Sequence, residues 1–230
     1  MAIELLTHPL YGDANLVSYW RFEGNSNDTK GLNNGVDTNI TYSIANGYFG
    51  QGAGIPTNGK IALADSASLS LTGAYTINAL INTSAPGAQK GIFEKYDFGD
   101  INGYLLRLSA AQKLVGFNFL AASYVSITGG TTIPTNTWTM VSLTYDGTNL
   151  RLHVNGVLDA SPVASGAPTN GSRAARIGNE GADSGPLGLD GKMDELFILS
   201  RAMSTAELLS YWNFLIGGGS PVFFDNTAIA

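Results

Sequence analysis

The chain has 230 residues, of which 44% are hydrophobic and only 13% charged, with a net charge of −6, 29 glycines and no cysteine. The absence of cysteine excludes disulfides and thiolate metal sites. The 12 basic residues are scattered along the chain, which argues against nucleic acid as a partner, and no apolar run of about 18 residues predicts a membrane span.

The N-terminal part predicts an extended arm followed by a strand. Residues 1–15 lack the basic and long apolar regions of a signal peptide, so no signal peptide is predicted in this chain. The first clear strand is 16–22. It is followed by a polar loop, 23–35, which contains two carboxylates, four asparagines and three glycines.

The middle of the chain alternates short apolar stretches with glycine-rich turns and shows no βαβ rhythm. Tyr75, Ile77, Ala79 and Ile81 are an example of the period of two that is typical of a strand. Short strands are predicted at residues 40–44, 60–63, 75–82, 91–96, 103–108, 113–119, 123–128, 174–178 and 191–199.

The strongest pattern lies between residues 138 and 160. Apolar residues take every second place in 141–145 and again in 150–154, and Asn155-Gly156 is a strong signal for a two-residue hairpin. We therefore expect three consecutive antiparallel strands, at 138–145, 150–154 and 157–160. Their apolar face requires a second sheet to cover it.

One short helix is predicted near the C-terminus. Ser204 and Glu207 have the spacing of a capping box, and an amphipathic stretch follows that ends before Gly217. Beyond it, residues 216–230 form a predicted C-terminal tail. In this tail Val222, Phe223 and Phe224 lie outside any obvious core and are candidates for docking to a partner.

Together these patterns predict an all-β fold: a two-sheet antiparallel sandwich with one short C-terminal helix. The sandwich is expected to cover residues 16–215 as one domain, between the N-terminal arm 1–15 and the tail 216–230. No internal repeat is present.

A series of motifs resembles one known family. The motifs occur in order at residues 16–23 (LVSYWRFE), 75–81 (YTINALI), 138–147 (WTMVSLTYDG), 150–156 (LRLHVNG), 191–199 (GKMDELFIL) and 200–208 (SRAMSTAEL). This order is similar to the laminin-G-like domains of the concanavalin A-like lectin/glucanase superfamily. The resemblance covers about 16–215 and implies a jelly roll of two curved sheets.

A structural calcium ion is predicted at the 23–35 loop. Calcium prefers six to eight oxygen ligands, which carboxylates, amides and carbonyls supply. The resemblance implies that the first and last strands lie close together, so that Asp194 would lie beside Glu23. We expect Glu23, Asn25, Asp28 and Asp194 to bind the ion. The alternative is that these side chains cap turns by hydrogen bonds to backbone amides.

A carbohydrate site is predicted on an exposed sheet face, because the resemblance implies sugar sites that combine aromatic faces with polar side chains. The alternative is that the same residues only solvate that face. The candidate ligand-binding residues are Tyr96, Asp97, Asp100, Asn102, Tyr104, Arg107, Tyr124 and His153.

No catalytic motif is present. The Glu-x-Asp-x-x-Glu strand of the superfamily's glucanases is absent, and neither the stretch around Glu94 nor Asp194-Glu195 matches it. The two histidines, His8 and His153, lie in no triad or zinc pattern, and His153 is expected on the surface.

The sequence therefore predicts a non-catalytic binding module on a virion or cell surface that recognises a glycan or a surface protein. One alternative is a structural decoration or tail protein of a phage particle. In that case the arms 1–15 and 216–230 would dock to virion neighbours or to further copies of the chain. The second alternative is a glycoside hydrolase.

Overall fold

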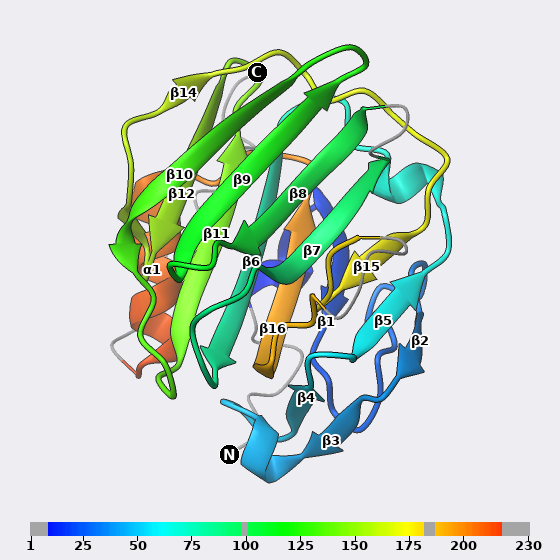
Figure 1. Cartoon of the computed structure of the whole chain (residues 1–230), viewed down its shortest axis with the longest axis vertical. Coiled ribbons are helices and arrows are strands. Elements are labelled where there is room, and N and C mark those ends of the chain that lie inside the picture. Colours follow the sequence, from blue (N-terminus) through cyan, green and yellow to red (C-terminus); the bar gives the residue numbers. More distant parts are fainter. Residues whose placement is uncertain (1–8, 98–100, 182–186, 218–230) are drawn as a thin grey trace.

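The structure, a computed structural model, describes residues 9–97, 101–181 and 187–217. These residues form two antiparallel sheets, of nine and seven strands, and one α-helix (Figure 1). The predicted all-β sandwich with one short C-terminal helix is confirmed.

The nine-stranded sheet forms one layer. Its order is β13-β12-β11-β6-β16-β4-β3, with β1 paired to β16 and β14 paired to β12. Its strands are β1 (Leu16–Trp20), β3 (Thr41–Ser43), β4 (Gly52–Ile55), β6 (Tyr75–Thr83), β11 (Thr139–Tyr145), β12 (Asn149–Val154), β13 (Val157–Leu158), β14 (Val163–Ala164) and β16 (Gly191–Leu199).

The seven-stranded sheet forms the second layer, which lies in front in Figure 1, in the order β10-β9-β8-β7-β15-β5-β2. Its strands are β2 (Gly35–Thr38), β5 (Lys60–Leu63), β7 (Lys90–Asp97), β8 (Asn102–Leu108), β9 (Lys113–Leu120), β10 (Tyr124–Thr132) and β15 (Ala175–Ile177). The remaining described elements are the 3-10 turns η2 (Pro9–Gly12), η3 (Ile44–Asn46) and η4 (Ala67–Leu69), and the helix α1 (Thr205–Leu215).

The predicted three-strand meander is present as β11, β12 and β13. Asn155 and Gly156 both have positive φ, at 50° and 78°, as the tight hairpin between β12 and β13 requires. The third strand is shorter than predicted and ends at Leu158. At Asp159 the pairing is divided between the two sheets. Its N–H still donates to the Leu152 carbonyl of β12, but its carbonyl oxygen accepts from the N–H of Gly130 and its Oδ1 from the N–H of Thr131, both in β10.

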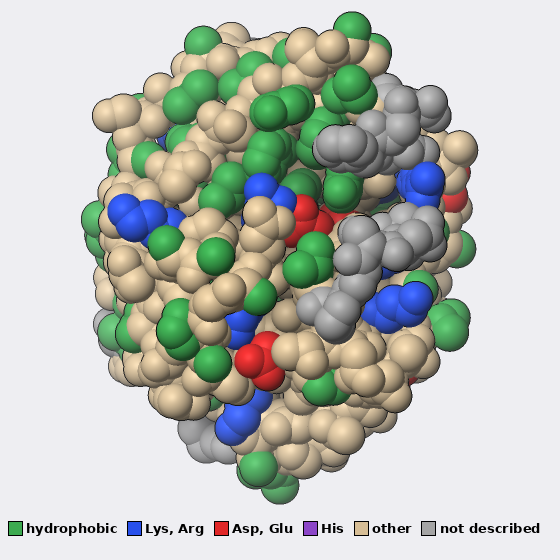
Figure 2. All heavy atoms as spheres, viewed as in Figure 1, with side chains coloured by type: hydrophobic (Ala, Val, Ile, Leu, Met, Phe, Trp, Pro, Cys, Tyr) green, Lys and Arg blue, Asp and Glu red, His purple; other side chains and the backbone are tan. Residues whose placement is uncertain are grey.

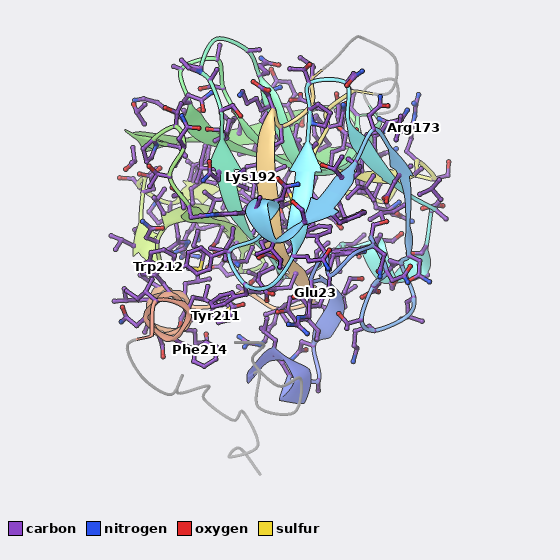
Figure 3. All side chains as sticks on the ribbon, turned by 90° about the horizontal axis from the view of Figure 1, so that it is seen from below. Glu23, Arg173, Lys192, Tyr211, Trp212 and Phe214 are labelled. Atoms are coloured by element: carbon purple, nitrogen blue, oxygen red, sulfur yellow. The ribbon has the colours of Figure 1, made fainter. Side chains whose placement is uncertain are left out.

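Two apolar clusters hold the layers together. The larger lies between the sheets and includes Phe93, Leu143 and Ile198, all fully buried. The second lies on the other side of the nine-stranded sheet, under α1, where Tyr211 meets Phe197 edge to face with ring centroids 5.4 Å apart. Figure 3 looks along α1 and shows Tyr211 pointing from the helix toward the sheet.

Helix α1 begins at the predicted capping box. Ser204 Oγ accepts from the N–H of Glu207, and Glu207 Oε2 accepts from the N–H of Ser204 at 2.7 Å. Its 11 residues end at Leu215. Among the described residues, no helix is long and apolar enough to cross a membrane.

Candidate functional site

The outward face of the seven-stranded sheet carries an unusual row of aromatic side chains. At the end of β9, polar and apolar residues have exchanged their usual sides of the sheet. Asn118 points inward, where its Oδ1 accepts from Tyr75 Oη at 2.7 Å, whereas Phe117 and Phe119 point outward. Figure 2 views this face and shows hydrophobic side chains gathered over its upper part. Apolar side chains gathered on a solvent-facing surface are typical of a binding site.

The rings in this row pack on one another. Tyr96 stacks on Phe119 with centroids 4.9 Å apart, and Phe117 stacks on Phe119 at 5.7 Å. Because these rings cover each other's faces, Phe119 is only 5% exposed. The ring of Tyr124 is tilted against both phenylalanine rings. Tyr124 is 59% exposed, which makes it the most exposed aromatic side chain of this row.

Gly103 makes the stack of Tyr96 on Phe119 possible. It pairs with Tyr96 on one side and Phe119 on the other, and it has no side chain to separate the two rings. Its φ is +98°, and a Cβ built on it would lie 1.8 Å from the carbonyl oxygen of Lys95. The position therefore admits only glycine without a shift of the backbone.

A cluster of four charged side chains lies next to the aromatic row. Arg107 Nη1 bonds to Glu180 Oε1 and also donates to Gln89 Oε1 at 3.0 Å. Arg176 Nη1 donates to Glu94 Oε1 at 2.7 Å, and the N–H of Gly181 donates to Glu94 Oε2 at 3.0 Å. Figure 2 shows acidic and basic side chains beside one another in the middle of this face.

The cluster is joined to the aromatic row through Phe117. The guanidinium carbon of Arg107 lies 4.9 Å from the Phe117 ring centroid, which is the geometry of a cation–π contact. The ring of Tyr124 lies 5.7 Å from the same ring. Arg107 and Tyr124 therefore both contact the ring of Phe117.

Glycine at position 91 brings Glu180 onto this face. Gly91 is the partner of Arg107 in the pairing of β7 with β8. A Cβ on Gly91 would lie 2.1 Å from the carbonyl carbon of Asn179, so the segment that leads to Glu180 crosses directly over it. The close approach places the Glu180 carboxylate beside Arg107.

The two glutamates are held in a poorly solvated environment. Burial raises the pKa of Glu94, with a further increase from the charge of Glu180, while the backbone N–H of Gly181 and Arg176 oppose the shift. Burial also raises the pKa of Glu180, against the lowering effect of Arg107. Each glutamate therefore depends on its arginine for the stability of its charged form.

The structure places three of the predicted ligand-binding residues on this face: Tyr96, Arg107 and Tyr124. Asp100 lies outside the described residues, as does the side chain of Asp97, the last residue of β7. Asn102 faces the other way and accepts from Thr169 Oγ1 at 2.6 Å, so it holds a loop rather than facing solvent.

Two of the predicted ligand-binding residues do not lie on an exposed sheet face, contrary to the expectation from the sequence. Tyr104 points into the core, is 1% exposed and donates from Oη to the Leu69 carbonyl at 2.9 Å. His153, expected on the surface, is fully buried, and its Nε2 lies 3.0 Å from Thr205 Oγ1 at the start of α1. The helix covers this part of the nine-stranded sheet, so the alternation that points His153 away from the core does not expose it.

The four predicted calcium ligands are not gathered at one point. Asp28 is buried, and each of its oxygens accepts two backbone N–H groups: Oδ1 from Tyr19 and Lys30, Oδ2 from Leu32 and Asn33. Asn25 is exposed and accepts from the N–H of Asn27. These two residues hold turns of their own loop, which is the alternative that the sequence left open.

Glu23 and Asp194 are near each other, as the resemblance implies. Asp194 Oδ2 accepts from the N–H groups of Tyr48 and Phe49 at 2.8 and 2.9 Å, and Glu23 Oε2 accepts from the N–H of Gln51 at 3.0 Å. Burial, with a smaller contribution from the charge of Glu23, raises the pKa of Asp194 to about 7. The two carboxylates thus fasten one loop to the sheet.

Among the described residues, no three His, Cys, Asp or Glu side chains are grouped so as to hold a metal ion. The side chains of this region do not fit the four-ligand calcium centre that the sequence predicts, because Asp28 and Asp194 already bind backbone amides. Calcium binding itself stays a prediction.

Family comparison supports the fold. The laminin-G-type model described as the concanavalin A-like lectin/glucanases superfamily matches residues 56–209. The chain belongs to this superfamily. No curated protein sequence matches the chain at a significant level.

Solved structures of binding domains have the same fold as this superfamily member. The binding domain of Paraclostridial Mosquitocidal Protein 1 superposes with a TM-score of 0.70 at 17% identity, over 87% of this chain and 52% of its own. Domain 4 of AbnA, an extracellular GH43 arabinanase from Geobacillus stearothermophilus, was solved with arabinotriose. It superposes with a TM-score of 0.63 at 20% identity, over 86% of this chain and 98% of its own.

The binding domain of botulinum neurotoxin DC, solved in complex with SialylT, gives a TM-score of 0.62 at 13% identity. The match covers 88% of this chain and 52% of the toxin chain. The superfamily member described here therefore spans about half the length of the toxin chains that it resembles. At these identities the likeness shows the fold.

The sequence reading missed Phe117, Phe119, Glu94, Glu180 and Arg176 as members of this face. The signal for the two phenylalanines was present, because residues 113–120 read KLVGFNFL and are apolar on both faces of a strand. Glu180 had no local signal, because the chain crossing that places it depends on tertiary contacts. The predicted docking residues Val222, Phe223 and Phe224 lie outside the described residues.

Proposed function

We propose that this protein is a non-catalytic carbohydrate-binding module that holds a glycan on the outward face of the seven-stranded sheet. The observation that carries the proposal is Tyr124, a 59% exposed ring braced by Phe117 and Phe119 beside a buried Arg107–Glu180 ion pair. An apolar surface combined with a few positioned polar groups is the usual composition of a small-ligand site.

Comparison with solved structures supports a glycan as the ligand. Domain 4 of the arabinanase, which matches nearly its whole length to this chain, was solved with arabinotriose, and a botulinum binding domain was solved with SialylT. These domains belong to an extracellular enzyme and to toxins, which supports an extracellular location for this module.

The contacts of Glu94, one of the two glutamates on the face, support binding rather than bond cleavage. Glu94 has both carboxylate oxygens engaged, one by Arg176 and one by the N–H of Gly181. A general acid must carry a proton that it can donate, and a nucleophile needs a free oxygen directed at the sugar. An arginine-bound carboxylate with both oxygens occupied provides neither.

The test is a glycan array probed with the purified full chain, followed by calorimetric titration of any glycan that binds. Tyr124→Ala is expected to abolish or strongly weaken binding. Val157→Ala removes an equally exposed apolar side chain, 58% exposed, from the edge of the other sheet and is expected to bind normally. Normal binding by Tyr124→Ala would refute the assignment of the face.

The non-catalytic part of the proposal has a separate test. The bound glycan is incubated with the protein and its reducing ends are measured over time. No increase is expected. An increase that disappears in Glu94→Gln or in Glu180→Gln would show that the protein is a hydrolase.

A further inference from the structure

We infer that the glycan held on this face is uncharged, and that Glu180 and Arg107 together bind one of its hydroxyl groups. The inference rests on the proposed function and specifies the chemistry of its ligand. It starts from two buried atoms: within the described residues, Glu180 Oε2 and Arg107 Nε have no hydrogen-bond partner. The side chains that carry them are 6% and 17% exposed.

The two atoms belong to one ion pair. The other oxygen of Glu180, Oε1, already bonds to Arg107 Nη1. A buried polar atom without a partner is rare in a native fold, and it points to a ligand or solvent group that completes it. Here the incomplete atoms are one acceptor and one donor.

A hydroxyl group matches this pair because it donates one hydrogen bond and accepts others. Both atoms are almost wholly covered, so a hydroxyl reaches them only when the side chains of the pair turn outward from the sheet. In that position its O–H can donate to Glu180 Oε2 while its oxygen accepts from Arg107 Nε. An ammonium group would satisfy the glutamate but would oppose the positive charge of Arg107. A carboxylate would accept from the arginine but would oppose the glutamate.

The charge balance of the cluster also disfavours an acidic sugar. Glu94 and Glu180 are each neutralised by one arginine, Arg176 and Arg107. An acidic ligand would compete for Arg107 and would leave Glu180 buried without its counter-charge. Separation of a buried ion pair is costly, and the already raised pKa of Glu180 shows that its charge is weakly supported.

The position of the pair suits a sugar that rests on Tyr124. Arg107 and Tyr124 contact the same ring, Phe117, at 4.9 and 5.7 Å between the groups. A sugar whose apolar face covers the tyrosine therefore lies next to the polar pair. The hydroxyl groups of a sugar project from the edge of its ring, so they point toward polar side chains that lie beside the tyrosine.

The test compares uncharged glycans with their acidic counterparts on the full chain. The probes are an array of uncharged oligosaccharides, arabinotriose among them, and array members that carry sialic acid or uronic acid. Calorimetric titration then measures the affinity of each bound glycan. We expect binding to uncharged members and at least tenfold weaker binding to the same glycans bearing an acidic sugar.

Two variants test the pair itself. Glu180→Gln keeps the shape but replaces an acceptor by an amide, and we expect affinity for the uncharged glycan to fall roughly 10- to 100-fold, the effect of losing a charged hydrogen bond. Arg107→Lys keeps the charge but removes Nε, and a similar fall is expected. Val157→Ala, at the edge of the other sheet, is the control and should change affinity less than twofold.

The outcomes separate this inference from the proposed function. Equal or tighter binding of acidic glycans would overturn the inference and leave the glycan-binding face intact. Unchanged affinity in both Glu180→Gln and Arg107→Lys, with circular dichroism spectra like that of the parent, would do the same. If no glycan binds, or if Tyr124→Ala binds normally, the proposed function itself fails.

Discussion

Replacement of Asp28 by asparagine separates the two roles that this residue was predicted to have. The side chain is 3% exposed, and its two oxygens accept four backbone N–H groups, which fasten the 28–33 loop to β1. An asparagine keeps one oxygen and turns an N–H₂ group toward the donors that the other oxygen served. Two charge-assisted hydrogen bonds are lost, each worth about 1.5–3 kcal/mol, so the free energy of unfolding should fall by about 3–6 kcal/mol.

The assay is equilibrium unfolding in urea, followed by tryptophan fluorescence. Trp20 is a suitable reporter because its Nε1 donates to the Asn33 carbonyl in the same loop at 2.9 Å. The matched control is Asn25→Ala, from the same predicted calcium set. Asn25 holds only an exposed turn, so its replacement should cost less than about 1 kcal/mol.

Two results would refute this reasoning. A fall below about 1 kcal/mol in Asp28→Asn would show that the four hydrogen bonds do not support the fold. Alternatively, EDTA could lower the stability of the parent protein to that of the variant and leave the variant unchanged. The aspartate would then act through a bound calcium ion, as the sequence alone predicted.

Three further predictions test other parts of the structure. Gly103→Ala places a Cβ against the Lys95 carbonyl and should lower the free energy of unfolding by more than about 2 kcal/mol and weaken glycan binding, as measured by urea titration and calorimetry. Burial under α1 lowers the pKa of His153 to about 4, from 6.5 in the unfolded chain, so the unfolded state binds more protons between these values. His153 should therefore contribute up to roughly 3 kcal/mol less to stability at pH 4 than at pH 6.5. The raised pKa of Asp194, about 7, acts in the opposite direction over the same range. The measurement is therefore the difference in unfolding free energy between the parent and His153→Gln, which should change by that amount in urea titrations across the range. Ser204→Ala removes the N-cap of α1 and should cost about 1 kcal/mol, with an unchanged slope of the unfolding free energy against urea concentration.

The fold was predictable because local patterns and tertiary structure agree over most of the chain. The alternation in residues 141–154 and the Asn155-Gly156 turn specify a hairpin whose register the structure confirms, with Val141 paired to Val154. The capping box at Ser204 likewise begins α1 where it was predicted. In each case the physical cause lies within a few residues of sequence.

The proposed binding face was only partly predictable because its geometry depends on which way each strand faces. Tyr104 and Phe117 lie on neighbouring strands, and only the pairing register shows that the first is buried and the second is outside. A shift of one residue in that register exchanges the two faces. Glu180 reaches the face only because the segment that contains Asn179 and Glu180 crosses over Gly91, and no local sequence pattern predicts such a crossing.

The position of β16 has a consequence for the synthesis of this protein. The strand pairs with β1, β4 and β6 in the interior of the nine-stranded sheet, yet it is synthesised after all the other described strands. When only the first 190 residues have been synthesised, the nine-stranded sheet therefore lacks a central strand, and the edges of β1, β4 and β6 that pair with β16 have no backbone partner. Native assembly of this sheet must wait until residues 191–199 have been synthesised, and a separately supplied peptide spanning 187–217 should be able to complete a truncated chain by inserting into the gap.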